Sequence, residues 1–313
     1  MDKKKLNPLA RFRGFIQAGA TLLTNIHLPN FAKGTLYQGN GKYVCVPGLN
    51  CYSCPGAAGA CPVGAFQAVV GSSKFSFSYY ITGFLILLGV LLGRFICGFL
   101  CPFGWFQELL HKIPTKKFST KKLKPLRYLK YAVLLVMVFL LPAFLVNDVG
   151  MGNPFFCKYL CPQGVLEGAI PLSLANSGIR SALGSLFTWK FGVLLTVIVL
   201  SVVFYRPFCK WLCPLGAFYA LFNRVSLFQI KVDKNKCVSC GKCAKACKMD
   251  VDVTKAPNHT ECIRCGMCIR TCPTGAVRFR YGFGDGKDKT KAAKKPQKII
   301  NNNNKEKKTD ENE

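Results

Sequence analysis

Acidic side chains are scarce in this sequence: 14 Asp and Glu stand against 43 Lys and Arg over 313 residues, for a formal net charge of +29. Histidine and methionine are rare as well, with three and five copies. So few methionines argue against copper handling, which favours clusters of Met and Cys. No Walker loop, Rossmann fingerprint or hydrolase triad signature is present. The sequence therefore gives no support to the common nucleotide-binding and hydrolase classes.

The basic residues flank apolar stretches, and no DNA- or RNA-binding motif accompanies them, so we expect no nucleic-acid partner. Half of the residues are hydrophobic. Spanning a bilayer takes about 20 apolar residues, with a range of about 17–25. Four stretches meet this condition and predict an all-α bundle of four transmembrane helices: Gly14–Ala32, Phe75–Gly93, Tyr131–Asn147 and about Leu186–Phe208. Buried helices of a soluble protein are the alternative interpretation.

Lys and Arg mark the loops that stay in the cytoplasm. They are concentrated before residue 14 and in the 94–130 loop, and they are sparse in residues 33–74 and 148–186. This pattern predicts a multi-pass protein of the cell membrane with both termini in the cytoplasm. A signal peptide is the competing interpretation of residues 1–32, but no A-x-A-like cleavage site is obvious.

Eight of the 18 cysteines form two runs with the spacing C-x2-C-x2-C-x3-C. This is the two-cluster ferredoxin pattern, in which the fourth cysteine of each run ligates the other cluster. One [4Fe–4S] cluster would then be held by Cys237, Cys240, Cys243 and Cys272. The other would be held by Cys247, Cys262, Cys265 and Cys268. A zinc site is the alternative, but zinc would use one CxxC pair per half.

These runs divide the chain into three predicted parts. Residues 1–228 form the transmembrane domain, and residues 229–283 form a small cytoplasmic α+β domain of the two-[4Fe–4S] ferredoxin type. Residues 284–313 are rich in Lys, Asn, Asp and Glu. Such a segment cannot bury enough surface to offset its ordering entropy, so we expect a disordered charged tail.

Most of the other cysteines belong to an internal repeat, in which Pro follows a cysteine and Gly comes two residues later. Three copies are complete CxxxCP units, and they contain Cys97 and Cys101, Cys157 and Cys161, and Cys209 and Cys213. A partial copy begins at Cys61, after Cys51 and Cys54. Proline is favoured at the first position of a helix, so we expect the preceding cysteine at the N-cap, where the helix dipole stabilises a thiolate. The glycine lets the backbone approach a bulky cluster.

The predicted topology sorts these cysteines into two groups. Four of them lie at the cytoplasmic end and match one [4Fe–4S] cluster: Cys97, Cys101, Cys209 and Cys213. At the outer end we favour a second cluster on Cys54, Cys61, Cys157 and Cys161, with Cys51 a close rival of Cys54 and the role of Cys45 left open. Redox-active dithiol or disulfide pairs are the main alternative for the outer cysteines, and apolar packing is another.

Arg94 and Arg206 each precede the first cysteine of an inner unit by three residues. A cluster with four thiolates is a net anion, so we predict that both arginines bind the cofactor electrostatically. Ordinary positive-inside anchors are the alternative. Glu108 and Glu167 follow Cys101 and Cys161 and are candidates for a quinone proton relay, with solvated carboxylates as the simpler interpretation.

On the ferredoxin runs and the three CxxxCP units, the chain resembles the membrane-bound polyferredoxins over about residues 10–280. That family includes the quinol dehydrogenase membrane subunit of periplasmic nitrate reductase and the nitrous oxide reductase electron-supply protein. The resemblance implies electron transfer along [4Fe–4S] clusters between a cytoplasmic donor or the quinone pool and an outward-facing redox partner, with a flavoprotein as one candidate partner. Quinone is a further candidate cofactor. A maturation factor for a metalloenzyme and a membrane redox sensor are the rival functions.

Overall fold

Three helices begin directly after a Cys-Pro dipeptide in the computed structural model, which describes residues 8–72, 78–148 and 151–282. They are α4 (Pro62–Gly71), α7 (Pro102–Leu110) and α14 (Pro214–Phe222). In each case the cysteine has extended backbone angles at the N-cap and proline is the first helical residue. The N-cap prediction is therefore confirmed for Cys61, Cys101 and Cys213.

The fourth copy differs locally. Cys161 has the same extended backbone, but it ends the π-helical stretch η5 (Phe156–Leu160). The next stretch, η6 (Gly164–Ala169), is also π-helical and continues into α10 (Ile170–Ala175). The wider π-helical turn is typical of functional sites, where it re-aims side chains.

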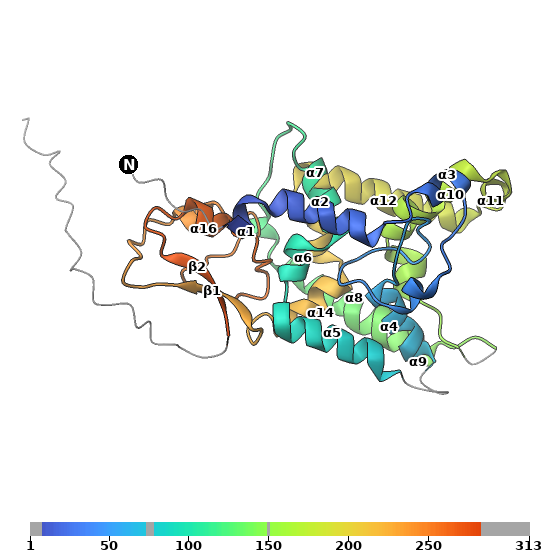
Figure 1. Cartoon of the computed structure of the whole chain (residues 1–313), viewed down its shortest axis with the longest axis horizontal. Helices are drawn as coiled ribbons and strands as arrows, with labels where there is room; N and C mark the ends of the chain where they lie inside the picture. The colour runs from blue at the N-terminus through green and yellow to red at the C-terminus, as the bar shows by residue number, and fades with distance from the viewer. Residues whose placement is uncertain (1–7, 73–77, 149–150, 283–313) are drawn as a thin grey trace, which may run out of the picture. The chain divides into compact units, whose positions relative to one another are not determined.

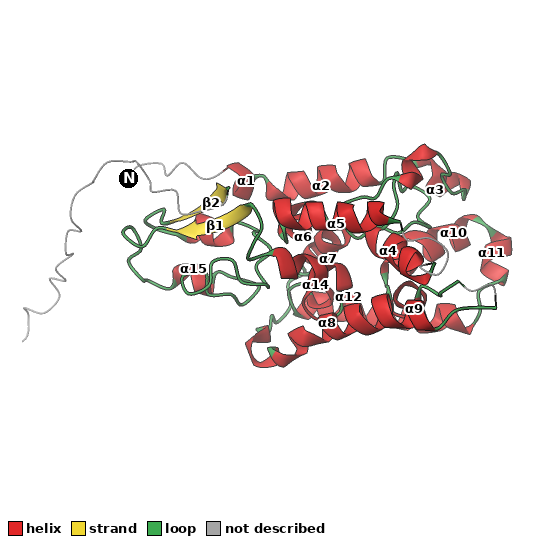
Figure 2. Cartoon of the chain, turned by 90° about the horizontal axis from the view of Figure 1, so that it is seen from below, coloured by secondary structure: helices red, strands yellow, loops and turns green. Residues whose placement is uncertain are grey.

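The remaining elements complete a mostly helical fold (Figure 1, Figure 2). They are α1 (Pro8–Arg11), α2 (Arg13–Thr24), α3 (Pro29–Lys33), η1 (Asn40–Tyr43), α5 (Tyr79–Leu92), α6 (Phe95–Phe99), η2 (Thr120–Leu123), η3 (Pro125–Tyr128), α8 (Leu129–Val133), η4 (Leu134–Leu140), α9 (Leu141–Phe144), α11 (Ser177–Ser181), α12 (Ser185–Val203), α13 (Pro207–Trp211), β1 (Phe228–Val232), α15 (Lys242–Lys245), α16 (Met267–Thr271) and β2 (Val277–Tyr281).

Two helical segments are long and apolar enough to cross a membrane, namely Pro125–Phe144 and Ser185–Val203. They coincide with the third and fourth predicted spans. The first predicted span is not one helix, because the chain leaves the helical path after Thr24 and α3 begins only at Pro29. The second contains α5, whose 14 residues rise only about 21 Å at 1.5 Å per residue. Four transmembrane helices are thus not shown.

The segment Phe228–Tyr281 forms a small α+β ferredoxin-like fold. Strands β1 and β2 pair antiparallel, with Ile230 opposite Phe279 and Val232 opposite Val277. The short helices α15 and α16 pack against each other, and each begins after a glycine with positive φ, Gly241 and Gly266. Residues 284–313, where a disordered tail is predicted, lie outside the described residues.

The ferredoxin segment packs onto the helices through one buried arginine. Arg264 lies between two cysteines of the second ferredoxin run and is fully buried. Its guanidinium donates to the carbonyl of Leu92 at 2.7 Å and to that of Asn223 at 2.6 Å, at the C-terminal ends of α5 and α14. Carbonyls at helix C-termini have no partner in the helix and attract cations. One side chain therefore caps two helices from the ferredoxin segment.

Gly93 makes this contact possible. Its φ of 52° and ψ of −137° suit glycine, and a Cβ there would lie 2.7 Å from Arg264 Nη1 and 2.9 Å from Asn223 Oδ1. We expect Gly93→Ala to lower the free energy of unfolding by about 1–3 kcal/mol through backbone strain and displacement of Arg264. Denaturant unfolding in detergent measures the loss, and limited proteolysis should release the ferredoxin segment sooner.

Gly83→Ala is the matched control, because Gly83 lies inside the same helix and a Cβ there would meet nothing within 4 Å. That change should stabilise the helix by about 0.5–1 kcal/mol. Equal stability of Gly93→Ala and the wild type would contradict the proposed role of the Arg264 contact.

Candidate metal centres

The cysteines of the ferredoxin segment are predicted to form two groups of four, quartets C and D. Quartet C gathers around a small cavity and consists of Cys247, Cys262, Cys265 and Cys268. The thiol of Cys268 interacts electrostatically with the other three. In quartet D, Cys243 interacts with Cys272, and Cys237 packs against the same small core. Cys240, the fourth predicted member of quartet D, precedes α15 and is exposed. The arrangement matches the predicted exchange of the fourth cysteine between the two runs.

Quartet B lies inside the helical part, at the starts of matching helices. It consists of Cys97, Cys101, Cys209 and Cys213, all of which are buried. The thiol of Cys213 interacts electrostatically with the other three. Cys97 lies in α6 and Cys209 in α13, while Cys101 and Cys213 cap the two helices that follow. The structure therefore brings together the four cysteines of the predicted inner group.

Quartet A lines a cavity of about 600 Å³. Its members are Cys51, Cys61, Cys157 and Cys161. The thiol of Cys161 interacts electrostatically with the other three. Cys54, which the sequence analysis favoured over Cys51, points elsewhere and donates from its thiol to Asn25 Oδ1 at 3.4 Å. The geometry thus favours the rival set that contains Cys51.

All 18 cysteines fall within the described residues, and each is a free thiol. The disulfide alternative for the outer cysteines is therefore absent from this structure. Across residues 8–72, 78–148 and 151–282, no three His, Cys, Asp or Glu side chains converge closely enough to hold one metal ion.

The loop that follows η1 connects quartets A and B. A Cβ on Gly48 would lie 2.8 Å from the Cα of Cys101, so the backbone of the loop lies directly against quartet B. The next two backbone amides diverge: that of Leu49 lies beside the Cys101 sulfur, and that of Asn50 lies beside the Cys61 sulfur. Two consecutive residues therefore contact one member of each quartet.

Two glutamines hold sulfurs of quartets A and B in the same way. Gln67 Nε2 donates to Cys157 Sγ at 3.1 Å, and Gln107 Nε2 donates to Cys209 Sγ at 3.1 Å. Both glutamines are fully buried, and each is the sixth residue after the capping cysteine of its repeat. The sequence analysis missed them. The shared pattern C-P-x-G-x-F-Q at Cys61 and Cys101 was the signal that could have revealed them.

Arg94 and Arg206 each donate a hydrogen bond to the other repeat of quartet B. Arg94 Nη2 donates to the carbonyl of Cys209 at 3.3 Å, and Arg206 Nη1 donates to the carbonyl of Cys97. Both side chains are fully buried. Among the described residues, the Nε of Arg94 and the Nη2 of Arg206 have no hydrogen-bond partner, whereas the Nε of Arg206 lies 2.9 Å from a carboxylate oxygen of Glu108. Such buried donors beside four thiols fit an anionic cluster, as the sequence predicted.

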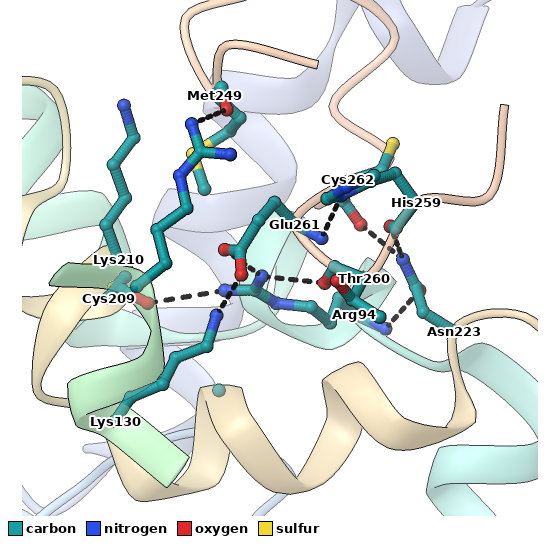
Figure 3. A network of polar contacts seen from close by, with 12 residues as sticks. Arg94, Lys130, Cys209, Lys210, Asn223, Met249, His259, Thr260, Glu261 and Cys262 are labelled. Atoms are coloured by element: carbon teal, nitrogen blue, oxygen red, sulfur yellow. Dashed lines mark hydrogen bonds and ion pairs between the residues drawn. The ribbon is translucent and has the colours of Figure 1, made fainter. Parts of the chain in front are cut away.

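A buried carboxylate of the ferredoxin segment neutralises Arg94 (Figure 3). Glu261 Oε2 lies 2.9 Å from Arg94 Nη1, and Glu261 Oε1 accepts from the ammonium of Lys130. Burial alone would raise the pKa of Glu261, but the charges of Arg94 and Lys130 outweigh it and lower this pKa to about 2. The carboxylate therefore stays ionised and holds the ferredoxin segment against quartet B.

Quartets B and C meet at a second close contact. A Cβ on Gly98, next to Cys97, would lie 2.3 Å from the carbonyl oxygen of Ile263, next to Cys262. At the matching position of the other repeat, the buried Lys210 donates to the carbonyl of Lys248 at 2.9 Å, next to Cys247. Only a glycine allows the first approach, so both repeats of quartet B contact the backbone that carries quartet C.

Neither of the two candidate relay carboxylates is a solvated surface group. Glu108 lies 2.9 Å from Arg206 Nε and also pairs with Arg13. Glu167 Oε2 accepts from the backbone amide of Cys51 at 3.0 Å, inside quartet A. The simpler interpretation from the sequence is therefore wrong for both residues, which form structural contacts within or beside a quartet.

Comparison with known proteins agrees with this arrangement. A family model described as a 4Fe-4S binding domain matches residues 59–79, 76–121, 130–170 and 186–235, so each copy contains one Cys-Pro unit. A second model with the same description matches residues 230–251 and 256–278, the two ferredoxin runs. No solved structure matches the chain.

Several curated proteins are similar to the chain. An uncharacterized protein of Methanocaldococcus jannaschii is 32% identical over 209 residues, which are 64% of this chain and 77% of that protein. The putative electron transport protein YccM of Escherichia coli is 28% identical, over 54% of this chain and 45% of its own length. The ferredoxin-type protein NapH of Haemophilus influenzae is 28% identical, over 35% of this chain and 52% of its own length. The regulatory protein NosR of Stutzerimonas stutzeri matches over 21% of its length.

The fold, the cysteine quartets and these matches define a ferredoxin-type iron–sulfur protein. More narrowly, the chain belongs to the polyferredoxin family of electron-transport proteins that resemble NapH and NosR. The family resemblance inferred from the sequence is confirmed.

Removal of the Glu261 charge tests the packing of the ferredoxin segment. We expect Glu261→Gln to lower the free energy of unfolding by about 3–5 kcal/mol, because Arg94 and Lys130 are left buried without a counter-charge. Asp233→Asn is the control. Asp233 forms a loose surface pair with Lys236 at 3.8 Å, and such pairs contribute about 0–1 kcal/mol. Asp233 Oδ1 also accepts from the backbone amide of Asn235 at 3.0 Å, a bond that asparagine retains. Unfolding curves of the holoprotein in detergent give both values. Similar losses in the two variants would contradict the assigned role of Glu261.

Proposed function

We propose that the chain is a membrane-embedded electron carrier that binds four [4Fe–4S] clusters, one on each quartet. The observation that supports this most strongly is that each quartet lies in contact with the next, from A to D. Quartets A and B share the Leu49–Asn50 backbone, and B and C touch through Gly98 and Ile263. Quartets C and D belong to one ferredoxin fold, in which each run supplies a cysteine to the other quartet.

When bound, each cluster supplies a one-electron redox couple. The chain contributes the environment of each site. Helix N-termini face the capping cysteines, Gln67 and Gln107 donate to ligand sulfurs, and Arg94 and Arg206 place positive charge at quartet B. Hydrogen bonds to the sulfurs, net charge and burial are the properties that set cluster potentials.

The apolar segments Pro125–Phe144 and Ser185–Val203 support a location in the membrane, as do the basic flanks seen in the sequence. In this proposal both termini and the ferredoxin segment face the cytoplasm, and quartet A lies towards the outer side. Electrons pass between a cytoplasmic donor or the quinone pool and an outward-facing redox partner. The similarity to YccM, a putative electron transport protein, and to NapH, a ferredoxin-type protein, supports this type of function.

Iron content and electron transfer across the proteoliposome membrane together test the proposal. Four clusters correspond to about sixteen irons per chain. Cys51→Ser should lose about four of them, whereas Cys54→Ser should keep all. In sealed proteoliposomes, dithionite outside should reduce ferricyanide trapped inside through the wild type and Cys54→Ser, and much more slowly through Cys51→Ser.

Two results would contradict the proposal in different ways. A wild type with about eight irons would limit the clusters to the ferredoxin segment. Full iron content without transmembrane electron transfer would leave an iron–sulfur protein that is not a carrier, and would favour the maturation factor or the sensor.

The two glutamines offer a matched pair of tests. Replacing Gln107 by Leu removes a hydrogen bond to Cys209 and should lower the midpoint potential of the quartet B cluster by roughly 40–60 mV, the one-electron equivalent of about 1–1.5 kcal/mol. Gln67→Leu should shift the quartet A cluster by a similar amount. EPR-monitored redox titration resolves the two signals. If each variant moved both potentials equally, the assignment of one glutamine to each quartet would fail.

A further inference from the structure

Quartet D differs from the other three in its exposure. Among the 18 cysteines, all of which lie in the described residues, Cys240 alone is exposed. Quartets A and B are largely buried in the helical part, and the Gly98 and Arg264 contacts cover quartet C. An electron carrier needs one centre close to solvent, and Cys240 marks that centre here.

Exposed lysines flank Cys240 on both sides in the sequence. Lys234 and Lys236 follow β1 and precede Cys237, and Lys242 and Lys245 begin and end α15 directly after Cys240. All four are exposed. Lys248 does not belong to this set, because its ammonium lies over the Tyr205 ring on the helical part. Two acidic side chains lie near this region: Asp233 forms a loose pair with Lys236 at 3.8 Å, and Asp252 interacts electrostatically with Cys243.

An apolar side chain lies within this basic region. Val238 is 64% exposed and lies between Cys237 and Cys240. Interfaces between proteins commonly combine an apolar centre with a charged or polar rim. We call Val238, Cys240 and the four lysines Lys234, Lys236, Lys242 and Lys245 the Cys240 face.

We propose that the Cys240 face docks an acidic, soluble one-electron carrier protein of the ferredoxin type and exchanges electrons with it through quartet D. This inference rests on the proposed function and names the partner of its solvent-facing end. The four positively charged lysines attract an acidic surface, steer its approach and raise the association rate at low salt. One electron leaves the reduced carrier and arrives at the cluster on quartet D, and no bond is made or broken.

Binding and electron transfer are measured separately with the full-length holoprotein in detergent. The probe is a small acidic two-[4Fe–4S] ferredoxin. Its dissociation constant is determined by titration at about 20 mM and 300 mM salt, and the second-order rate constant for reduction of the chain is determined by stopped flow. We expect affinity and rate to fall at least tenfold between the two salt concentrations, because the charges are screened over about 10 Å at 0.1 M.

The test variant reverses three charges of the face, with Lys236→Glu, Lys242→Glu and Lys245→Glu. The control variant makes the same change in net charge elsewhere, with Lys33→Glu, Lys116→Glu and Lys121→Glu, all at exposed positions. At low salt the test variant should lose at least tenfold in affinity and rate and most of its salt dependence, while the control should stay within about threefold of the wild type.

Dithionite separates failure of this inference from failure of the proposed function. If dithionite reduces all clusters in both variants and the acidic carrier still binds and reacts equally with both, the docking face is wrong and the carrier function stands. If dithionite leaves the wild-type clusters beyond the ferredoxin segment oxidised, the proposed function itself fails. Unchanged iron content and midpoint potentials in the test variant confirm that its loss is one of docking.

Discussion

The structure depends on the burial of cysteine side chains together with positive charge. Charges buried alone are costly, so each must be paired or hydrogen-bonded. Of the described residues, five cationic side chains are at most 1% exposed: Arg94, Lys130, Arg206, Lys210 and Arg264. All but Arg206 form contacts between the helical part and the ferredoxin segment. Two of them, Arg94 and Arg206, lie against the quartet B cysteines, and the others fix the ferredoxin segment in place. The excess of basic residues is therefore partly an internal requirement of the fold.

The internal repeat explains why the two inner CxxxCP units form the same contact with each other. The arginine of each inner unit donates to the carbonyl of the first cysteine in the other unit, so neither repeat can complete quartet B alone. The counter-charges then differ. Glu108 pairs with Arg206 from inside the helical part, whereas Glu261 pairs with Arg94 from the ferredoxin segment. Completion of quartet B therefore couples the folding of the helical part to the docking of the ferredoxin segment.

The sequence predicted the cysteine groups well because their spacing is local. The ferredoxin runs, the N-cap cysteines and the two arginines follow from short motifs whose geometry the chain itself determines. The first predicted span is not a single helix in the structure, because hydropathy does not show that the chain turns at residues 25–28, where Asn25 is buried and contacts Cys54. The repeat favoured Cys54 over Cys51, whereas the tertiary path of the loop places Cys51 at the cavity and Cys54 against Asn25.

The loop between Cys45 and Cys61 also changes the electron path that topology suggested. A bilayer core is about 30 Å thick, so quartets at opposite faces would need a quinone or another carrier between them. The loop instead enters the helical part, where Gly48 lies against Cys101 and Asn50 lies beside Cys61. Tyr219 interacts electrostatically with Cys97 and Cys101 of quartet B and with Cys61 of quartet A, and its hydroxyl donates to the carbonyl of Pro47 at 3.1 Å. In the proposed function, this adjacency of quartets A and B allows an electron to pass directly between clusters bound there, with no quinone between them.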